Sequence, residues 1–455
     1  MTYRYRVASV FLVGFFIDCI NIFMSAVAMP RIAADLHVGD TTVAWVANAY
    51  ILGLTLIIPI STWLAGRWGE RRVLTASMLA FSVCAGLCGQ ATTFGTLVTS
   101  RFVQGMAGGL LIPVGQALTF NLFQGEQRAR ISALIMAVAL LAPALSPTLG
   151  GLIVDHSSWR WVFRGTIPFA LVAAVLAWLW IKEAPAKAQP RPDLAGLLLV
   201  SASLASVLLG MSLYGASYSA WLALCCLAAG GLFAVLYTRH QRRARDAIID
   251  LRLLRSPRLS LSILVYHAIP GVFTGVNLLN IFFLQNTLGF TAQATGLFMI
   301  LYAGGAFLAI VLCGRYYNRV GAKRLFTLGL CLHSVGIATL FLVNGASDLG
   351  VLMAAYSLMG VGGGIGANTA QTTALLDFQG TDTQHASVIW NINRQVAFSL
   401  GAALLLMVFN LLLSPFSATQ AYHATALIAA LVGLFPLLHV GALSAQKERH
   451  AQPQP

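Results

Sequence analysis

Long apolar runs alternate with short charged or turn-rich breaks along the whole chain. A helix needs about 20 apolar residues to cross the hydrocarbon core of a bilayer, and fourteen runs approach or exceed that length. The pattern therefore predicts an all-α polytopic membrane protein with fourteen transmembrane helices. The predicted spans cover residues 7–29, 44–64, 73–90, 95–122, 129–154, 162–181, 194–214, 219–238, 259–287, 293–313, 325–343, 349–376, 386–413 and 422–443.

Composition supports lipid as the solvent of these runs. Of the residues 58% are hydrophobic and 9% are charged, with a mean hydropathy of +0.79. A soluble domain carries about 25% charged residues. The seven cysteines all lie in apolar runs; Cys84 and Cys88 lie one helical turn apart, but no histidine or acid joins them as a metal site would require. We therefore expect buried thiols and no metal site.

The basic residues predict the orientation of the chain. The net charge of +14 comes mainly from short breaks between spans and not from a nucleic-acid-binding patch. With a cytoplasmic N-terminus, 23 of the 28 lysines and arginines lie in or beside segments that face the cytoplasm. We expect a multi-pass protein of a bacterial inner membrane with both termini in the cytoplasm, in contact with lipid and not with nucleic acid.

An internal repeat divides the chain. The stretch from Thr62 to Arg72 matches that from Gly314 to Arg324 at an offset of 252, and Gly105 matches Gly360 at an offset of 255. Two parallel six-helix repeats are typical of the major facilitator fold, whose substrate site lies near the midplane. The predicted domains are an N-terminal six-helix bundle (1–183), a two-helix insert (184–245) and a C-terminal six-helix bundle (246–455).

Several short motifs then carry a family resemblance. They are the segments 62–72, 101–105, 142–151, 158–163, 282–285 and 391–395. Over essentially its whole length the chain resembles the fourteen-helix drug:proton antiporter group of the major facilitator superfamily. The resemblance implies proton-coupled export of drugs or amphipathic small molecules by alternating access. It also implies the proton gradient as the energy source, no cofactor, and a monomer; whether a periplasmic adaptor is used stays open.

The chain departs from the motifs of that group at several positions. Gly66 and Asn318 stand where the first-loop element and its repeat carry an acid. The first-span element places Asn21 at its acidic position, and Asp18 lies one turn earlier.

Asp18 is the only acidic residue well inside a predicted span. A charge at the bilayer centre costs roughly 2.5–3.5 kcal/mol on insertion scales, so intramembrane acids usually serve a function. We assign proton coupling to Asp18 and, from the resemblance, to Arg101. The alternatives are a permanent structural pair for Asp18 and a snorkelling or carbonyl-capping role for Arg101.

Polar and aromatic residues within spans are candidates for a substrate cavity, with interhelical hydrogen bonds as the alternative. They are Asn21, Asn48, Tyr50, Gln116, Asn277, Asn280, Asn368, Gln371, Trp390, Asn391 and Arg394. His267 is a further candidate proton carrier. Residues of the loop repeats and of the fifth span are candidates for conformational gating: Arg67, Gly69, Arg71, Arg72, Pro143, Pro147, Gly150, Gly151, Arg319 and Gly321.

Enzymatic function finds no support in the sequence. The glycine clusters at 105–109 and 360–366 lack the pattern that cradles a nucleotide and are better explained by close helix packing. Two other functions stay open: a proton-independent uniporter or metabolite importer of the same fold, and, more remotely, a non-transporting membrane receptor.

Overall fold

The computed structural model describes residues 2–123, 126–183, 192–215, 220–244, 247–290 and 292–441, and this part of the chain is helical without a strand. The first-half helices are α1 (Tyr3–Asp35), α2 (Asp40–Val43), α3 (Trp45–Ile57), η1 (Ile58–Ile60), α4 (Ser61–Trp68), α5 (Glu70–Gln90), α6 (Phe94–Leu122), α7 (Glu126–His156), α8 (Arg160–Arg164) and α9 (Ile167–Trp180). The insert follows as α10 (Leu194–Gly215) and α11 (Ala220–Gln241).

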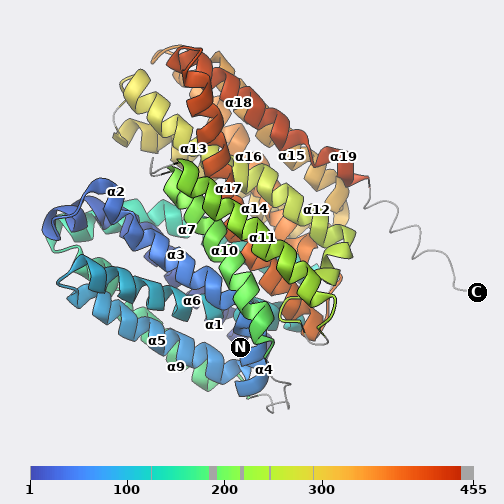
Figure 1. Ribbon diagram of the computed structural model, residues 1–455. Helices are drawn as coiled ribbons and strands as arrows, with labels where there is room; N and C mark the ends of the chain where they lie inside the picture. The colour runs from blue at the N-terminus through green and yellow to red at the C-terminus, as the bar shows by residue number, and fades with distance from the viewer. Residues whose placement is uncertain are drawn as a thin grey trace, which may run out of the picture. The chain divides into compact units, whose positions relative to one another are not determined.

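The second half begins with the short η2 (Leu251–Arg255) and repeats the pattern of long helices (Figure 1). Its elements are α12 (Pro257–Tyr266), η3 (His267–Gly271), α13 (Val272–Phe282), η4 (Phe283–Thr287), α14 (Ala292–Val320), α15 (Ala322–Thr339), η5 (Leu340–Leu342), α16 (Leu349–Ala374), α17 (Thr381–Leu413), α18 (Ala418–Leu434) and α19 (Leu437–Val440).

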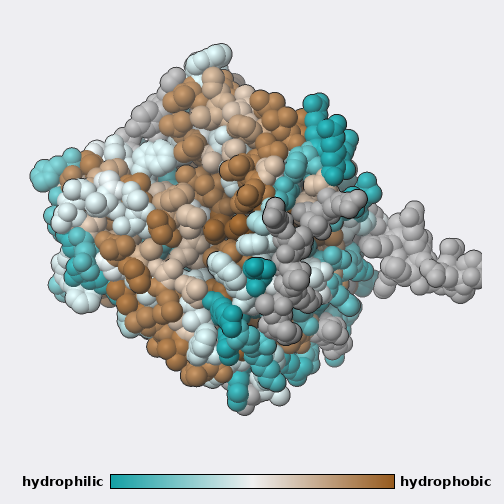
Figure 2. Space-filling view, turned by 60° about the horizontal axis from the view of Figure 1, so that its bottom comes forward, coloured by the Kyte–Doolittle hydropathy of each residue, from teal (hydrophilic) through white to brown (hydrophobic). Residues whose placement is uncertain are grey.

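Thirteen helices of the described residues are long and apolar enough to cross a membrane. Some consist of joined pieces, such as Trp45–Trp68 and Pro257–Thr287. Each of the thirteen corresponds to one predicted span, with ends that differ by a few residues, and the remaining span, 129–154, falls in the 31-residue helix α7. Apolar side chains cover much of the face seen in Figure 2, as expected of a surface that meets lipid. The predicted all-α polytopic architecture is confirmed.

The chain forms two compact units that do not coincide with the three predicted segments. Unit 1 contains Met1–Gln124, Leu141–Leu251 and Phe378–Gln395; unit 2 contains Gly125–Leu140, Arg252–Asp377 and Val396–Pro455. The insert therefore joins unit 1, while α7 and α17 each pass from one unit into the other.

Specific contacts explain why α7 and α17 are divided. Near the start of α7, Arg128 donates a hydrogen bond to the carbonyl oxygen of Leu375 at 2.8 Å, within unit 2. Near the start of α17, Gln384 donates to Glu70 at 3.3 Å, within unit 1. These contacts link positions 247 and 314 residues apart in the chain, so the sequence repeat alone does not reveal them.

The repeated loops adopt the same backbone conformation in the two halves. Gly69, between α4 and α5, has φ +86° and ψ 146°, and Gly321, between α14 and α15, has φ +85° and ψ 150°. Glycine reaches positive φ at no steric cost because it lacks a Cβ atom. The matching geometry supports the internal repeat deduced from the sequence.

The insert helices pack closely on each other and attach to α3. Figure 1 shows α10 and α11 side by side, and Ser203 on α10 donates to the carbonyl oxygen of Gly230 on α11 at 2.9 Å. Asn48 on α3 donates to Ser212 on α10 at 2.6 Å. The amide of Asn48 thus ties the insert to unit 1.

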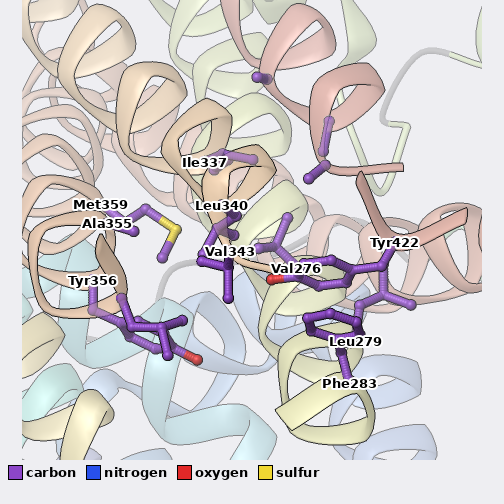
Figure 3. Packing of buried hydrophobic residues seen from close by; sticks show 14 of the residues in the cluster. Val276, Leu279, Phe283, Ile337, Leu340, Val343, Ala355, Tyr356, Met359 and Tyr422 are labelled. Carbon is purple, nitrogen blue, oxygen red and sulfur yellow. The ribbon is translucent and has the colours of Figure 1, made fainter. Parts of the chain in front are cut away.

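The core of unit 2 combines apolar side chains with one buried polar network (Figure 3). The Tyr422 ring stacks on Phe283, with the ring centroids 3.9 Å apart. Asn280 donates to the Tyr356 hydroxyl at 3.0 Å and accepts from the Tyr422 hydroxyl at 2.8 Å. Because buried polar groups need partners, this network fixes α13, α16 and α18 in one register.

Candidate functional site

Asp18 and Tyr50 meet inside unit 1. Asp18 lies midway along α1 and is 1% exposed, and Tyr50 on α3 is fully buried. The Tyr50 hydroxyl donates a hydrogen bond to Oδ1 of Asp18. The sequence placed Asp18 at a proton site and Tyr50 in a substrate cavity. The structure makes Tyr50 the direct partner of the acid, and its place in a substrate cavity stays a prediction.

Glycines on α6 allow this meeting. A Cβ atom on Gly105 would lie 2.0 Å from the backbone oxygen of Tyr50, so α6 and α3 approach backbone to backbone at this position. One turn further along α6, a Cβ on Gly108 would lie 2.7 Å from Oδ1 of Asp18 and 2.9 Å from the Tyr50 hydroxyl. The absent side chains thus provide the space for the pair, in agreement with the packing interpretation of this cluster.

Unit 2 repeats this arrangement of a tyrosine hydroxyl against a glycine, but without the acid. Tyr302 stands 252 residues after Tyr50, and Gly363 stands 255 residues after Gly108. A Cβ on Gly363 would lie 2.9 Å from the Tyr302 hydroxyl. In place of a carboxylate, the Tyr302 ring stacks on Phe273 at 3.8 Å between centroids. The repeat therefore supplies the frame in both units, but the described part of unit 2 has no acid at this position.

Arg101 on α6 is fully buried beside this pair, so it does not snorkel. Its guanidinium lies over the Tyr50 ring, 4.2 Å from the centroid. Its donors reach the Val46 carbonyl oxygen at 3.1 Å, Gln104 Oε1 at 2.9 Å, Ser25 Oγ at 3.2 Å, and Asn21 Oδ1. Arg101 is thus held by neutral acceptors, and the hydroxyl of the tyrosine beneath it holds Asp18.

The first half of α17 adds a second polar group to unit 1. Asn391 is buried and donates to Gln116 on α6 at 2.6 Å. One turn later the Arg394 guanidinium lies over the Phe15 ring of α1, 5.1 Å from its centroid. Trp390 is fully buried on the same segment. The structure therefore brings Asn391, Arg394 and Gln116 to the helices that carry Asp18 and Arg101.

The predicted cavity residues of the second half belong to unit 2 and not to this cluster. Asn280 is buried with both ends of its amide engaged, as described above. Asn368 and Gln371 are buried on α16, whereas Asn277 is only partly buried on α13. His267 uses its Nδ1 to contact the Ile263 carbonyl oxygen at 3.0 Å. A role of these residues in substrate binding stays a prediction.

The predicted gating residues are dispersed over both units. Arg71 and Arg72 form ion pairs with Glu183, and Arg71 also lies 4.3 Å from the Trp178 ring centroid. The side chains of Arg67 and Arg319 are exposed. On α7, a Cβ on Gly150 would lie 3.3 Å from Val27, whereas one on Gly151 would meet no atom within 4 Å. The side chains of Pro143 and Pro147 lie outside the described residues.

Comparison with known proteins settles the family. The family model described as the Major Facilitator Superfamily matches residues 11–240 and 263–454. The chain belongs to the major facilitator superfamily. Proteins of this family are transporters and not enzymes, so the prediction of a non-enzymatic transporter is confirmed.

Similar sequences come from several bacteria. The chain is 27% identical over 403 residues to the "Uncharacterized MFS-type transporter YhcA" of Bacillus subtilis, covering 88% of this chain and 76% of that protein. It is 28% identical to a "Multidrug resistance protein B homolog" of Mycobacterium tuberculosis (88% and 75% covered). It is 26% identical to a "Putative multidrug resistance protein MdtD" of Pectobacterium carotovorum (87% and 86%).

Solved structures show the same fold at low identity. The human organic anion transporter MFSD10 (TETRAN) superposes with a TM-score of 0.69 at 14% identity, covering 97% of this chain and all of that one. The proton:xylose symporter XylE superposes with a TM-score of 0.66 at 14% identity, with 96% of each chain covered.

The sequence alone did not single out Gly108, Gln104 or Ser25 as parts of the site. A faint signal was present, because Gln104 follows Arg101 by three residues and Ser25 follows Asn21 by four, which places each pair on one helix face. No group of three or more histidines, cysteines or acids suited to a metal ion occurs among the described residues.

Proposed function

We propose that this major facilitator transporter is a proton-coupled exporter of drugs or amphipathic small molecules. The observation that carries the proposal is Asp18, an acid buried midway along α1 and bonded to Tyr50. Bacterial relatives named as multidrug resistance proteins support the substrate class. In this proposal Asp18 binds and releases the coupled proton. The proton gradient is the energy source, and no cofactor is needed.

The chemistry of Asp18 suits exchange. An ionised carboxylate in a low-dielectric interior is costly unless charge or hydrogen bonds compensate it, so its proton state depends on what lies nearby. The Tyr50 hydroxyl donates a hydrogen bond to Oδ1 of Asp18, which leaves Oδ2 to hold a proton. A cationic substrate stabilises the ionised form and a proton neutralises it, so the two compete for one group and exchange follows.

The setting we propose is a bacterial inner membrane with both termini in the cytoplasm and the chain acting as a monomer. The distribution of basic residues and the bacterial relatives support it. The glycines at 105 and 108 and the buried Arg101 then act as the fixed frame of the proton site, and the loops at Gly69 and Gly321 as places where helices turn during alternating access.

The test uses purified protein in proteoliposomes with ethidium, a planar aromatic cation, as the probe. An imposed pH gradient, acidic inside, drives uphill ethidium accumulation by the natural protein, and an uncoupler abolishes it. Asp18→Asn abolishes accumulation as well. The matched control is Asp348→Asn, which changes an acid in the loop before α16. There, hydrogen bonds from the backbone N–H groups of Asn344 and Gly345 lower the pKa of Asp348.

The outcomes separate the candidate functions. Ethidium movement that follows only its own gradient, in the natural protein and in Asp18→Asn alike, supports the uniporter alternative and refutes proton coupling. Accumulation that survives in Asp18→Asn keeps proton coupling but removes it from Asp18.

A further inference from the structure

The two arginines near Asp18, the fully buried Arg101 and the partly buried Arg394, differ in how many of their donors are in use. Arg101 reaches four oxygen acceptors, one of them a backbone carbonyl, and lies against the rings of Tyr50 and Phe163. An arginine held by that many partners on three helices cannot move without breaking most of them. It is therefore part of the frame.

Arg394 is held much more loosely. Its hydrogen bond to Asn391 Oδ1 is long, at 3.5 Å, and its buried Nε has no hydrogen-bond partner among the described residues. No acid of the described part of the chain forms an ion pair with it. A guanidinium has five N–H donors, and leaving a buried one such as Nε without an acceptor costs free energy. The arrangement calls for an anionic partner.

Asp18 is within reach of this cation. Arg394 lies over the Phe15 ring, and Phe15 precedes Asp18 by three residues on α1. Positions three apart share one helix face and differ by about 4.5 Å along the axis.

We propose that Arg394 is the counter-ion of ionised Asp18. In the structure Asp18 is bonded to Tyr50 and Arg394 rests on Phe15; when Asp18 loses its proton, the guanidinium swings from the ring to the carboxylate. The inference rests on the proposed proton role of Asp18, but it assigns the charge compensation to Arg394 and not to Arg101. Arg394 is thus a positioning residue that acts through Asp18.

Among the described residues around Asp18, Arg101 is the one other cation, and its own partners hold it in place. On α1 the nearest titratable neighbour is Cys19; α3 contributes Tyr50, α6 contributes Arg101, and α17 contributes Arg394. From α5, the Phe81 ring packs against the same Gly108. Because Arg101 is held in place, its charge acts on Asp18 in the same way before and after ionisation. A cation that moves toward ionised Asp18 must therefore come from α17.

Arg394 lies close to the point where α17 passes from unit 1 into unit 2. Residues 381–395 of this helix belong to unit 1, and the helix continues into unit 2 from Val396 onward. Arg394 is therefore next to the point where α17 leaves unit 1. A change in its partner acts directly on the segment of helix that connects the two units.

The test reads the protonation of Asp18 directly and does not depend on transport. The carboxyl C=O stretch is followed by infrared spectroscopy between pH 4 and pH 9 on purified protein in lipid nanodiscs, and its absence in Asp18→Asn identifies the band. If Arg394 is the counter-ion, Arg394→Gln moves the midpoint of the titration to higher pH by about one to three pH units. Arg394→Lys, which keeps the charge, restores most of the shift.

The control is Arg31→Gln, which removes an exposed arginine near the end of α1 and leaves the midpoint unchanged. An equal midpoint in the natural protein and in Arg394→Gln overturns the proposal, as does a shift that Arg394→Lys fails to restore. If Asp18 titrates with Arg394 as described but ethidium transport ignores the proton gradient, the counter-ion stands and the proposed function fails; the two failures are therefore distinguishable.

Discussion

The space above Gly108 makes Gly108→Ala the sharpest structural test of the Asp18–Tyr50 pair. The new Cβ atom would lie 2.7 Å from Oδ1 of Asp18, 2.9 Å from the Tyr50 hydroxyl and 3.5 Å from the Phe81 ring. The first two separations are below normal van der Waals contact, so the acid and the tyrosine must shift. Overpacking of this kind costs about 1–3 kcal/mol, and losing the hydrogen bond between Tyr50 and the protonated carboxyl adds about 0.5–1.5 kcal/mol.

Two matched glycine variants separate these contributions. Gly363→Ala places a Cβ 2.9 Å from the Tyr302 hydroxyl at the equivalent position of the repeat, where no acid is present, and Gly304→Ala on α14 enters open space. The free energy of unfolding, measured by denaturant titration in mixed micelles, is expected to fall most for Gly108→Ala, less for Gly363→Ala and least for Gly304→Ala. The Asp18 carboxyl band should change only in Gly108→Ala.

A Gly108→Ala protein as stable as Gly304→Ala, with an unaltered carboxyl band, would refute the geometry. It would mean that Asp18 and Tyr50 are not packed against α6 as described. Reduced stability with an unaltered band would instead show that the added methyl group displaces other atoms, and the pairing of Asp18 with Tyr50 would stand.

Two further predictions address the partner of the acid and the repeated loops. Tyr50→Phe keeps the ring under Arg101 but removes the hydroxyl, so the midpoint of the Asp18 titration should move to higher pH because the ionised form loses a donor; an unmoved midpoint contradicts the hydrogen bond. Gly321→Ala forces a residue with a Cβ into φ +85° and ψ 150° and should lower the free energy of unfolding by about 1–3 kcal/mol, whereas Gly296→Ala on the neighbouring helix, with no atom within 4 Å, should not.

The sequence predicted the architecture well because lipid imposes a simple rule on each span. Every long apolar run is a helix in the described chain. The loop repeat is also present in the backbone, since Gly69 and Gly321 have nearly the same φ angle. Hydropathy and repetition are properties of neighbouring positions, so one sequence is enough to read them. The predicted domain limits differ from the compact units because α7 and α17 are divided by contacts such as that of Arg128 with Leu375.

The sequence predicted which residues belong to the site but not which of them contact one another. Asp18 and Arg101 stood out because a charge within a span is costly. Their actual partners depend on helix rotation and on the approach of α3 to α6, which the hydropathy pattern does not specify. Asn48 and Asn280 show the same limit, because hydropathy did not reveal that Asn48 binds Ser212 of the insert or that Asn280 joins two tyrosines. Their role in a substrate cavity stays a prediction.

The most direct measurement of the central claim is ethidium accumulation in proteoliposomes under an imposed pH gradient. The natural protein should concentrate the dye above its external level for as long as the gradient lasts, and Asp18→Asn should only equilibrate it or leave it outside. Equal accumulation by the two proteins would contradict a proton site at Asp18, and equilibration without accumulation by both would contradict proton coupling altogether.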